Sequence, residues 1–150
     1  MIKREGFKTY KQRGELTELL FMTRATENGL NVSKPWGDSA RYDVSVEHRG
    51  HFLRVQVKST CAPRGKAGYI CSLKRTGIAY YRVEDVEFFA IYVVPEEVWY
   101  IIPSVVVLRL RSNIRLAPRV AGQKYEPYME AWELLRYEKA EARAALDGGK

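Results

Sequence analysis

The chain has 150 residues, 46% of them hydrophobic and 29% charged, so it has the length of one domain and enough apolar side chains for a core. This composition argues against disorder over the full length, and two cysteines without a CxxC pair argue against a disulfide framework or a structural zinc site. Lys and Arg number 25 against 18 Asp and Glu, and the net charge of +7 favours a polyanionic partner, either nucleic acid or an acidic membrane surface.

The first predicted element is a helix over residues 11–27. Asn28-Gly29 then provides a helix stop, with glycine in the left-handed position. Apolar or small side chains recur at helical spacing and define the face expected to be buried: Leu16, Leu19, Leu20 and Thr23. Glu15 lies about 40° around the helix from Leu19, at the edge of this face.

Strands are predicted through the middle of the chain, at residues 30–34, 42–47, 52–60, 69–73, 86–94 and 98–102. The second and third of these alternate around a glycine-containing tetrapeptide, which predicts a β-hairpin. Residues 62–68 are expected to form a loop, and residues 105–120 fit no single element. Trp36, Trp99 and Trp132 are interpreted as packing residues.

A final helix is predicted over residues 128–145, followed by a frayed tail at 147–150. No repeat or linker divides the chain, so residues 1–150 are expected to form a single domain. The N-terminus turns polar at once, and the longest apolar run, 98–108, is too short to span a bilayer. We therefore expect a cytoplasmic protein without a membrane partner.

The hairpin brings together residues that suit a chemical site. If it closes on Arg49-Gly50, His48 lies opposite His51, each further pair steps back along both strands, and Asp43 lies opposite Gln56. Lys58 follows two residues later, on the same face as Gln56. A register shift of one residue would move Asp43 to the other face.

A carboxylate and an amide oxygen suit a hard cation such as Mg²⁺, which keeps several of its waters. A neighbouring lysine can orient the attacking water or stabilise developing negative charge, which is what hydrolysis of a phosphodiester requires. Glu15 is the candidate for an additional carboxylate, provided that its helix packs across the hairpin.

The order Glu15, Asp43, Gln56-Val57-Lys58 resembles the motif of the PD-(D/E)xK nucleases, and the closest resemblance is to the group I intron-associated homing endonucleases. The resemblance covers roughly residues 11–103 and is consistent with a chain of one-domain size. It implies an α/β fold with a restriction-endonuclease-like core, a mixed β-sheet flanked by helices. It also implies an Mg²⁺-dependent DNA endonuclease in which Asp43, Glu15 and Gln56 hold the metal and Lys58 assists the attacking water.

The sequence departs from the motif at two positions. Tyr42 replaces the proline, and the neutral Gln56 replaces an acidic residue, which should weaken metal binding. A Holliday-junction resolvase and a restriction-type nuclease remain alternatives because they share this chemistry, and Gln56 supports a catalytically silent DNA-binding module of the same fold as another. A basic protein-interaction domain is a further alternative. Without a site, Asp43, Gln56 and Lys58 would form only the solvated face of an amphipathic hairpin.

Basic residues outside the motif are candidates for contacts with DNA phosphates. They are Arg64, Lys66, Lys74 and Arg75 after the hairpin, and Arg109 and Arg111, which would share one face of a strand. Because a duplex has two strands to cut, double-stranded DNA and a homodimer or higher homo-oligomer are the expected partners.

Overall fold

A computed structural model describes residues 9–74, 81–110 and 113–137. It begins with helix α1 (Tyr10–Glu27), whose N-cap Thr9 accepts a hydrogen bond from the backbone N–H of Gln12. Asn28 and Gly29 end the helix, with Gly29 at a φ of 77°. The helix stop predicted at this point is therefore confirmed.

The main sheet has five strands in the order β1-β2-β3-β6-β7. Their bounds are β1 (Asn31–Ser33), β2 (Val44–His48), β3 (His51–Thr60), β6 (Phe88–Val93) and β7 (Val98–Pro103). β3 and β6 pair in parallel while the other neighbours are antiparallel, so the sheet is mixed. This is the fold class expected from the resemblance.

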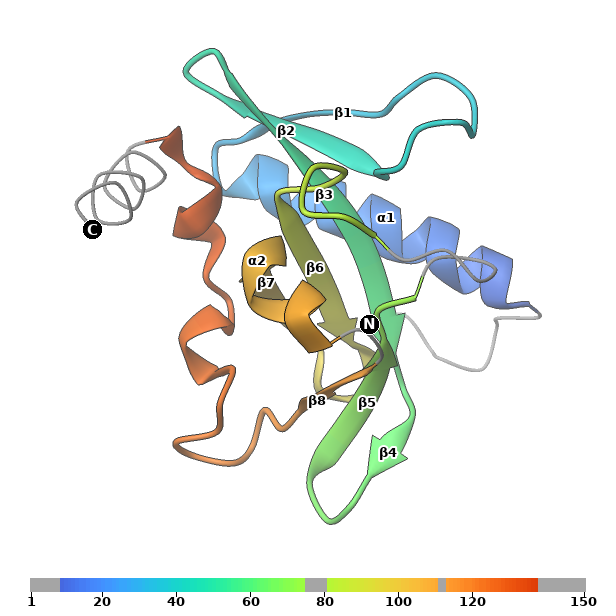
Figure 1. Ribbon diagram of the computed structural model, residues 1–150, viewed down its shortest axis with the longest axis vertical. Helices are drawn as coiled ribbons and strands as arrows, with labels where there is room; N and C mark the ends of the chain where they lie inside the picture. The colour runs from blue at the N-terminus through green and yellow to red at the C-terminus, as the bar shows by residue number, and fades with distance from the viewer. Residues whose placement is uncertain (1–8, 75–80, 111–112, 138–150) are drawn as a thin grey trace.

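A second sheet, in the order β4-β5-β8, consists of β4 (Pro63–Arg64), β5 (Gly68–Ser72) and β8 (Asn113–Leu116). β4 falls in the stretch predicted to be a loop. Short helices complete the chain: η2 (Val94–Glu96), α2 (Ser104–Val107), η3 (Leu108–Leu110), η4 (Glu126–Tyr128) and η5 (Trp132–Leu135). Figure 1 shows α1 beside β2 and β3, and the β4-β5 hairpin extending past the far end of β3.

The two faces of the main sheet carry separate hydrophobic clusters. Phe88 and Ala90 of β6 pack on the side of α1, together with Trp132. Phe89 and Ile91, which alternate with them, pack on the opposite side against α2 and β8. The sheet is thus buried on both faces, and polar residues reach solvent mainly at its edges and strand ends.

The buried face of α1 differs from the predicted one. Thr17, Phe21 and Ala25 are buried, whereas Leu19 is 57% exposed and Thr23 is exposed. Phe21 fixes the rotation of the helix because its ring stacks on Trp132 and meets Trp99 edge-on, at centroid distances of 5.6 and 5.7 Å. Trp99 and Trp132 are packing residues as expected, but Trp36 is 99% exposed, so the packing interpretation was wrong for it.

The helix predicted over residues 128–145 does not form over residues 128–136. The short turn η5 follows at Trp132–Leu135, and before it Glu130 makes one backbone and one side-chain hydrogen bond to β7. Its backbone N–H donates to the carbonyl of Trp99 at 2.7 Å, and its carboxylate accepts from the N–H of Trp99. Residues 138–150, including the predicted frayed tail, lie outside the described residues.

Arg109 does not lie on a strand, where it was predicted to share a face with Arg111. Arg109 is exposed on η3, and residue 111 lies outside the described part of the chain. Within the described ranges, no helix is long and apolar enough to cross a membrane.

Candidate active site at the open edge of strand β3

The hairpin of β2 and β3 has the predicted register. Val44 pairs with Val55 and His48 with His51, so the hairpin closes on Arg49-Gly50 as expected. β2 begins at Val44, and residues 56–60 of β3 therefore lack a ladder partner on this side, while β6 pairs with them on the other. The open edge is the place where an external ligand can approach the sheet.

Asp43 lies where this open edge begins and forms hydrogen bonds with β3. Its backbone N–H donates to the carbonyl of Val55 at 3.1 Å. Its Oδ2 accepts from the backbone N–H of Val57 at 2.9 Å and from Nε2 of Gln56 at 2.6 Å. The carboxylate thus replaces a ladder hydrogen bond and lies directly against Gln56, as the register predicts.

Burial raises the pKa of Asp43 from 3.8 to about 6. The hydrogen bond from the Val57 N–H opposes this shift, the charge of Glu18 adds to it, and Lys58 and Lys34 lower the pKa again. Without a bound cation, Asp43 therefore ionises less readily than a solvated aspartate. A half-buried carboxylate beside a second carboxylate is a site where positive charge is stabilised.

The carboxylate of α1 that acts on Asp43 is Glu18. At 100° per residue, Glu18 lies about 60° from the centre of the buried stripe of α1 and Glu15 about 120° away. Glu15 is exposed, whereas the Glu18 side chain retains 21% exposure and pairs with Lys34. The structure thus brings Asp43, Gln56 and Lys58 together with Glu18 and leaves Glu15 on the solvent side.

The sequence pattern does not point to Glu18, because the predicted buried face of the helix is the one that carries the leucines. The available signal was Phe21, the largest apolar side chain in the helix, whose i−3 and i−4 neighbours are Glu18 and Thr17.

Lys58 lies two residues beyond Gln56 on β3. Its Nζ donates to the carbonyl of Lys74 at 3.0 Å and lies 5.5 Å from the centre of the Tyr81 ring. Burial lowers the pKa of Lys58, while Cys71 and Asp43 act to raise it. Its ammonium is thus partly desolvated, and it is held by a carbonyl and an aromatic face rather than by a tight ion pair.

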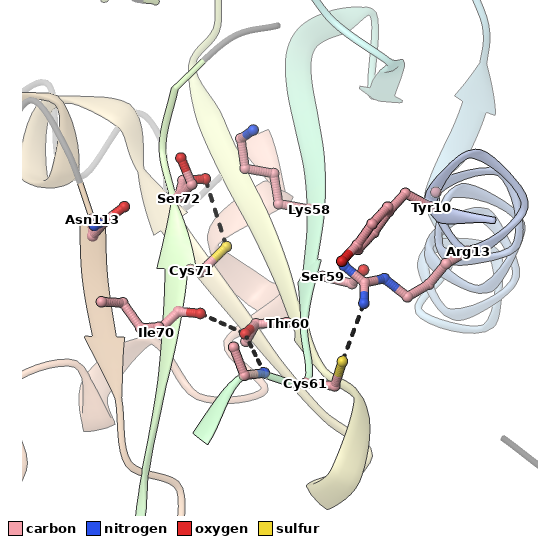
Figure 2. Close-up of a pocket in the computed structure, with 12 residues that line it drawn as sticks. Tyr10, Arg13, Lys58, Ser59, Thr60, Cys61, Ile70, Cys71, Ser72 and Asn113 are labelled. Carbon is pink, nitrogen blue, oxygen red and sulfur yellow. Dashed lines mark hydrogen bonds between the residues drawn. The ribbon is translucent and has the colours of Figure 1, made fainter. Parts of the chain in front are cut away.

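A cavity of about 530 Å³ opens beside Lys58. Figure 2 shows its walls: the first turns of α1 with Tyr10 and Arg13, the end of β3, and β5 with β8 on the opposite side. Lys58 is among the lining residues, so the cavity and the Asp43 cluster adjoin along the same strand edge.

The remaining basic candidates lie outside this cavity. Arg64 and Lys66 are exposed around β4 and its turn, and Lys74 is exposed after β5. Arg75 lies outside the described residues.

The donor set fits a hard divalent cation of the Mg²⁺ type. Such ions bind through one or two carboxylates, neutral oxygens and retained waters. Asp43 and Glu18 supply two carboxylates, and Gln56 supplies a neutral amide oxygen. No cluster of three or more His, Cys, Asp or Glu side chains occurs among residues 9–74, 81–110 and 113–137, so a metal site built from such a cluster is not found there.

Comparison with solved structures found similar chains. The chain is similar to the bacterial homing endonuclease I-Ssp6803I, with 29% sequence identity and a TM-score of 0.79 over 90% of this chain and 98% of that one. It also matches the Holliday junction resolvase Hjc of Archaeoglobus fulgidus, with 16% identity and a TM-score of 0.47 over 70% of this chain and 84% of that one. A comparison with curated protein sequences found no match.

The sequence also matches a protein family over most of its length. The family described as PD-(D/E)XK endonuclease matches residues 8–135, a range that contains Glu18, Asp43, Gln56 and Lys58. The chain therefore belongs to the PD-(D/E)XK endonuclease family.

Proposed function

We propose that this protein is a divalent-metal-dependent endonuclease that hydrolyses phosphodiester bonds in double-stranded DNA, with Mg²⁺ as the metal. The observation that carries the proposal is the contact of Asp43 with Gln56 at the open edge of β3, with Lys58 two residues further on. Similarity to a homing endonuclease along nearly its whole length supports the homing type among the activities of this family.

Each residue has a role that follows from its surroundings. Asp43 and Glu18 would hold the metal, and Gln56 would both orient Asp43 through its amide N–H and offer a neutral oxygen. When bound, the metal supplies a polarised water and neutralises charge on the phosphate. Lys58 orients the attacking water and stabilises the negative charge that develops on the phosphate oxygens.

A cleavage assay tests the proposal. Plasmids carrying a randomised target library are incubated with the protein in Mg²⁺ or in EDTA, and cut products are sequenced. Asp43→Asn, Lys58→Met and Glu18→Gln should each abolish cleavage, whereas Glu15→Gln, a matched control on the same helix, should retain it. Equal loss in Glu15→Gln and Glu18→Gln would contradict the assignment of Glu18.

A catalytically silent DNA-binding module is the second candidate, and Gln56 favours it because a neutral amide removes one negative charge from the metal site. Binding of duplex DNA with no cut product from the library would support this alternative.

We also propose that the protein acts as a homodimer or higher homo-oligomer, since one chain offers one site and a duplex has two strands. Light scattering of the protein on a short duplex checks this expectation. A strict 1:1 complex that still cuts both strands would contradict it.

A further inference from the structure

The cavity beside Lys58 is positively charged. Lys58 and Arg13 both line it, and none of the described residues that line it carries a carboxylate. The other polar groups around it are hydroxyls, thiols and an amide, contributed for example by Ser59, Cys61 and Asn113. Such a lining favours an anion.

Arg13 is held in place without being neutralised. Its Nη1 donates to Sγ of Cys61 at 3.1 Å, and its guanidinium carbon lies 5.2 Å from the centre of the Tyr10 ring. A thiol sulfur is a weak acceptor, and a guanidinium has five N–H donors. Within the described ranges, no carboxylate forms an ion pair with Arg13. The side chain is therefore oriented and still able to bind an anion.

Gly14, next to Arg13, has no side chain and leaves space between the helix backbone and the cavity. It lies in the interior of α1, where glycine is less favourable than alanine, and it lines the cavity. A Cβ at this position would meet no atom of the described structure within 4 Å, so packing inside the chain does not require a glycine. The space above it is available to a ligand that approaches the backbone closely.

Arg13 and Lys58 are displaced to the same side of the carboxylate cluster. Arg13 precedes Glu18 by five residues, which is about 7.5 Å along the helix axis. Lys58 follows Gln56 along β3, and the contact of Arg13 with Cys61 joins the two elements at this end. A single nucleic-acid strand can therefore contact the acidic cluster and the cationic cavity together.

We propose that the cavity receives a backbone phosphate of the bound DNA strand next to the scissile phosphate, and that Arg13 is its positioning residue. This inference rests on the proposed function, because it assumes that DNA crosses the open edge of β3. Arg13 fixes where the strand lies and takes no part in the bond cleavage.

Alkylation of Cys61 locates the bound DNA. Cys61 is exposed and lines the cavity while Cys71 is buried, so N-ethylmaleimide should react at Cys61. The labelling rate is measured at low salt in EDTA, with and without a 20-bp duplex of mixed sequence, since phosphate contacts bind duplexes of any sequence. The duplex should slow labelling in proportion to the fraction of protein bound, and added salt should restore the rate.

Arg13→Ala and Lys11→Ala form a matched pair, because Lys11 is exposed on the same helix but does not line the cavity. Arg13→Ala should reduce the slope of log K against log salt by about 0.9, the value for one phosphate contact. It should also weaken protection of Cys61, with each rate compared with that of the same variant without DNA. In Lys11→Ala, the duplex should protect Cys61 as strongly as it does in the unmodified protein. Melting temperatures check that both variants fold.

The outcomes separate the two proposals. If the protein binds and cuts DNA while Cys61 reacts equally fast with and without duplex, the cavity does not hold the strand and the inference is overturned. If Arg13→Ala leaves the salt slope unchanged, Arg13 does not position a phosphate. If the unmodified protein neither binds nor cuts DNA, the proposed function fails and this inference fails with it.

Discussion

Comparing Asp43→Asn with the wild type tests how much an ionised carboxylate at the edge of β3 lowers the free energy of unfolding. Burial raises the pKa of Asp43 from 3.8 to about 6, so the folded protein holds this proton more tightly than the unfolded chain does. The stabilising contribution of this proton is fully present below about pH 4 and is lost as the pH rises through about 6. At neutral pH without metal, ionised Asp43 therefore destabilises the fold.

The magnitude follows from the shift. About two pKa units at about 1.4 kcal/mol each give about 3 kcal/mol. Asp43→Asn keeps an oxygen that can accept from Gln56 and Val57, so the main hydrogen bonds of the wild-type side chain can be retained. In EDTA at pH 8, the variant should be more stable than the wild type by up to about 3 kcal/mol, and this difference should vanish towards pH 4.

Urea unfolding from pH 4 to 8 in EDTA gives the free energy of unfolding of both proteins. Asp85→Asn serves as a control of opposite sign. Burial tends to raise the pKa of Asp85, but hydrogen bonds from Arg82 and Arg41 hold it below its ordinary value, so this variant should lose stability at neutral pH.

Adding Mg²⁺ should then stabilise the wild type and leave Asp43→Asn nearly unchanged, because the proposed site binds the metal in the folded state through Asp43. The reasoning is refuted if Asp43→Asn is less stable than the wild type at pH 8 in EDTA, or if the difference between them does not change with pH.

Four further substitutions test other parts of the structure. Trp132→Ala should cost about 3–5 kcal/mol by urea unfolding because it empties a buried aromatic cluster. Trp36→Ala should change stability by less than about 0.5 kcal/mol because the side chain is exposed. Gly14→Ala should raise the free energy of unfolding by about 0.4–1 kcal/mol and weaken duplex binding in a fluorescence anisotropy titration; a gain in stability with unchanged binding would contradict a close approach of DNA. Gln56→Glu should lower stability in EDTA by placing a second carboxylate against Asp43 and should tighten Mg²⁺ binding by calorimetry; unchanged metal affinity would show that this side chain does not contact the ion.

The hairpin register could be predicted because its determinants are local. Alternation over two short strands and a turn at Arg49-Gly50 fix which residues face each other, and the positive φ of both turn residues matches that closure. From the register, the contact of Asp43 with Gln56 follows without any knowledge of the rest of the chain.

The rotation of α1 could not be predicted in the same way. Two overlapping stripes are compatible with its sequence, and the leucine stripe looks more apolar than the stripe of Thr17, Phe21 and Ala25. The choice between them depends on Trp99 and Trp132, which come from β7 and η5 and form the aromatic cluster that receives Phe21. The prediction of Glu15 depended on the leucine stripe, since the rotation of the helix decides which carboxylate turns towards Asp43.

The C-terminal segment shows a similar competition between local pattern and tertiary contact. Met129, Trp132 and Leu135 have helical spacing, yet Glu130 adopts a φ of 51° and pairs through both backbone and side chain with Trp99. The free edge of β7 offers hydrogen bonds that a helix at this point would leave unmade, and no local pattern in the sequence signals that edge.

Because α1 and β3 run in opposite directions, the acidic cluster around Asp43 and the cations Arg13 and Lys58 lie at different points along the same two elements. From the centre of the site towards the cavity, the helix passes from Glu18 to Arg13 while the strand passes from Gln56 to Lys58. Both elements therefore carry the oxygens of the proposed metal site at one point and cations further along, and the Arg13–Cys61 contact holds them together at the cationic end. A phosphodiester strand needs both environments at once: a metal where its bond breaks, and fixed positive charge where the neighbouring phosphate must be held. A neutral Gln56 fits this division, because a third carboxylate would extend the acidic region towards Lys58 and further raise the cost of burying Asp43.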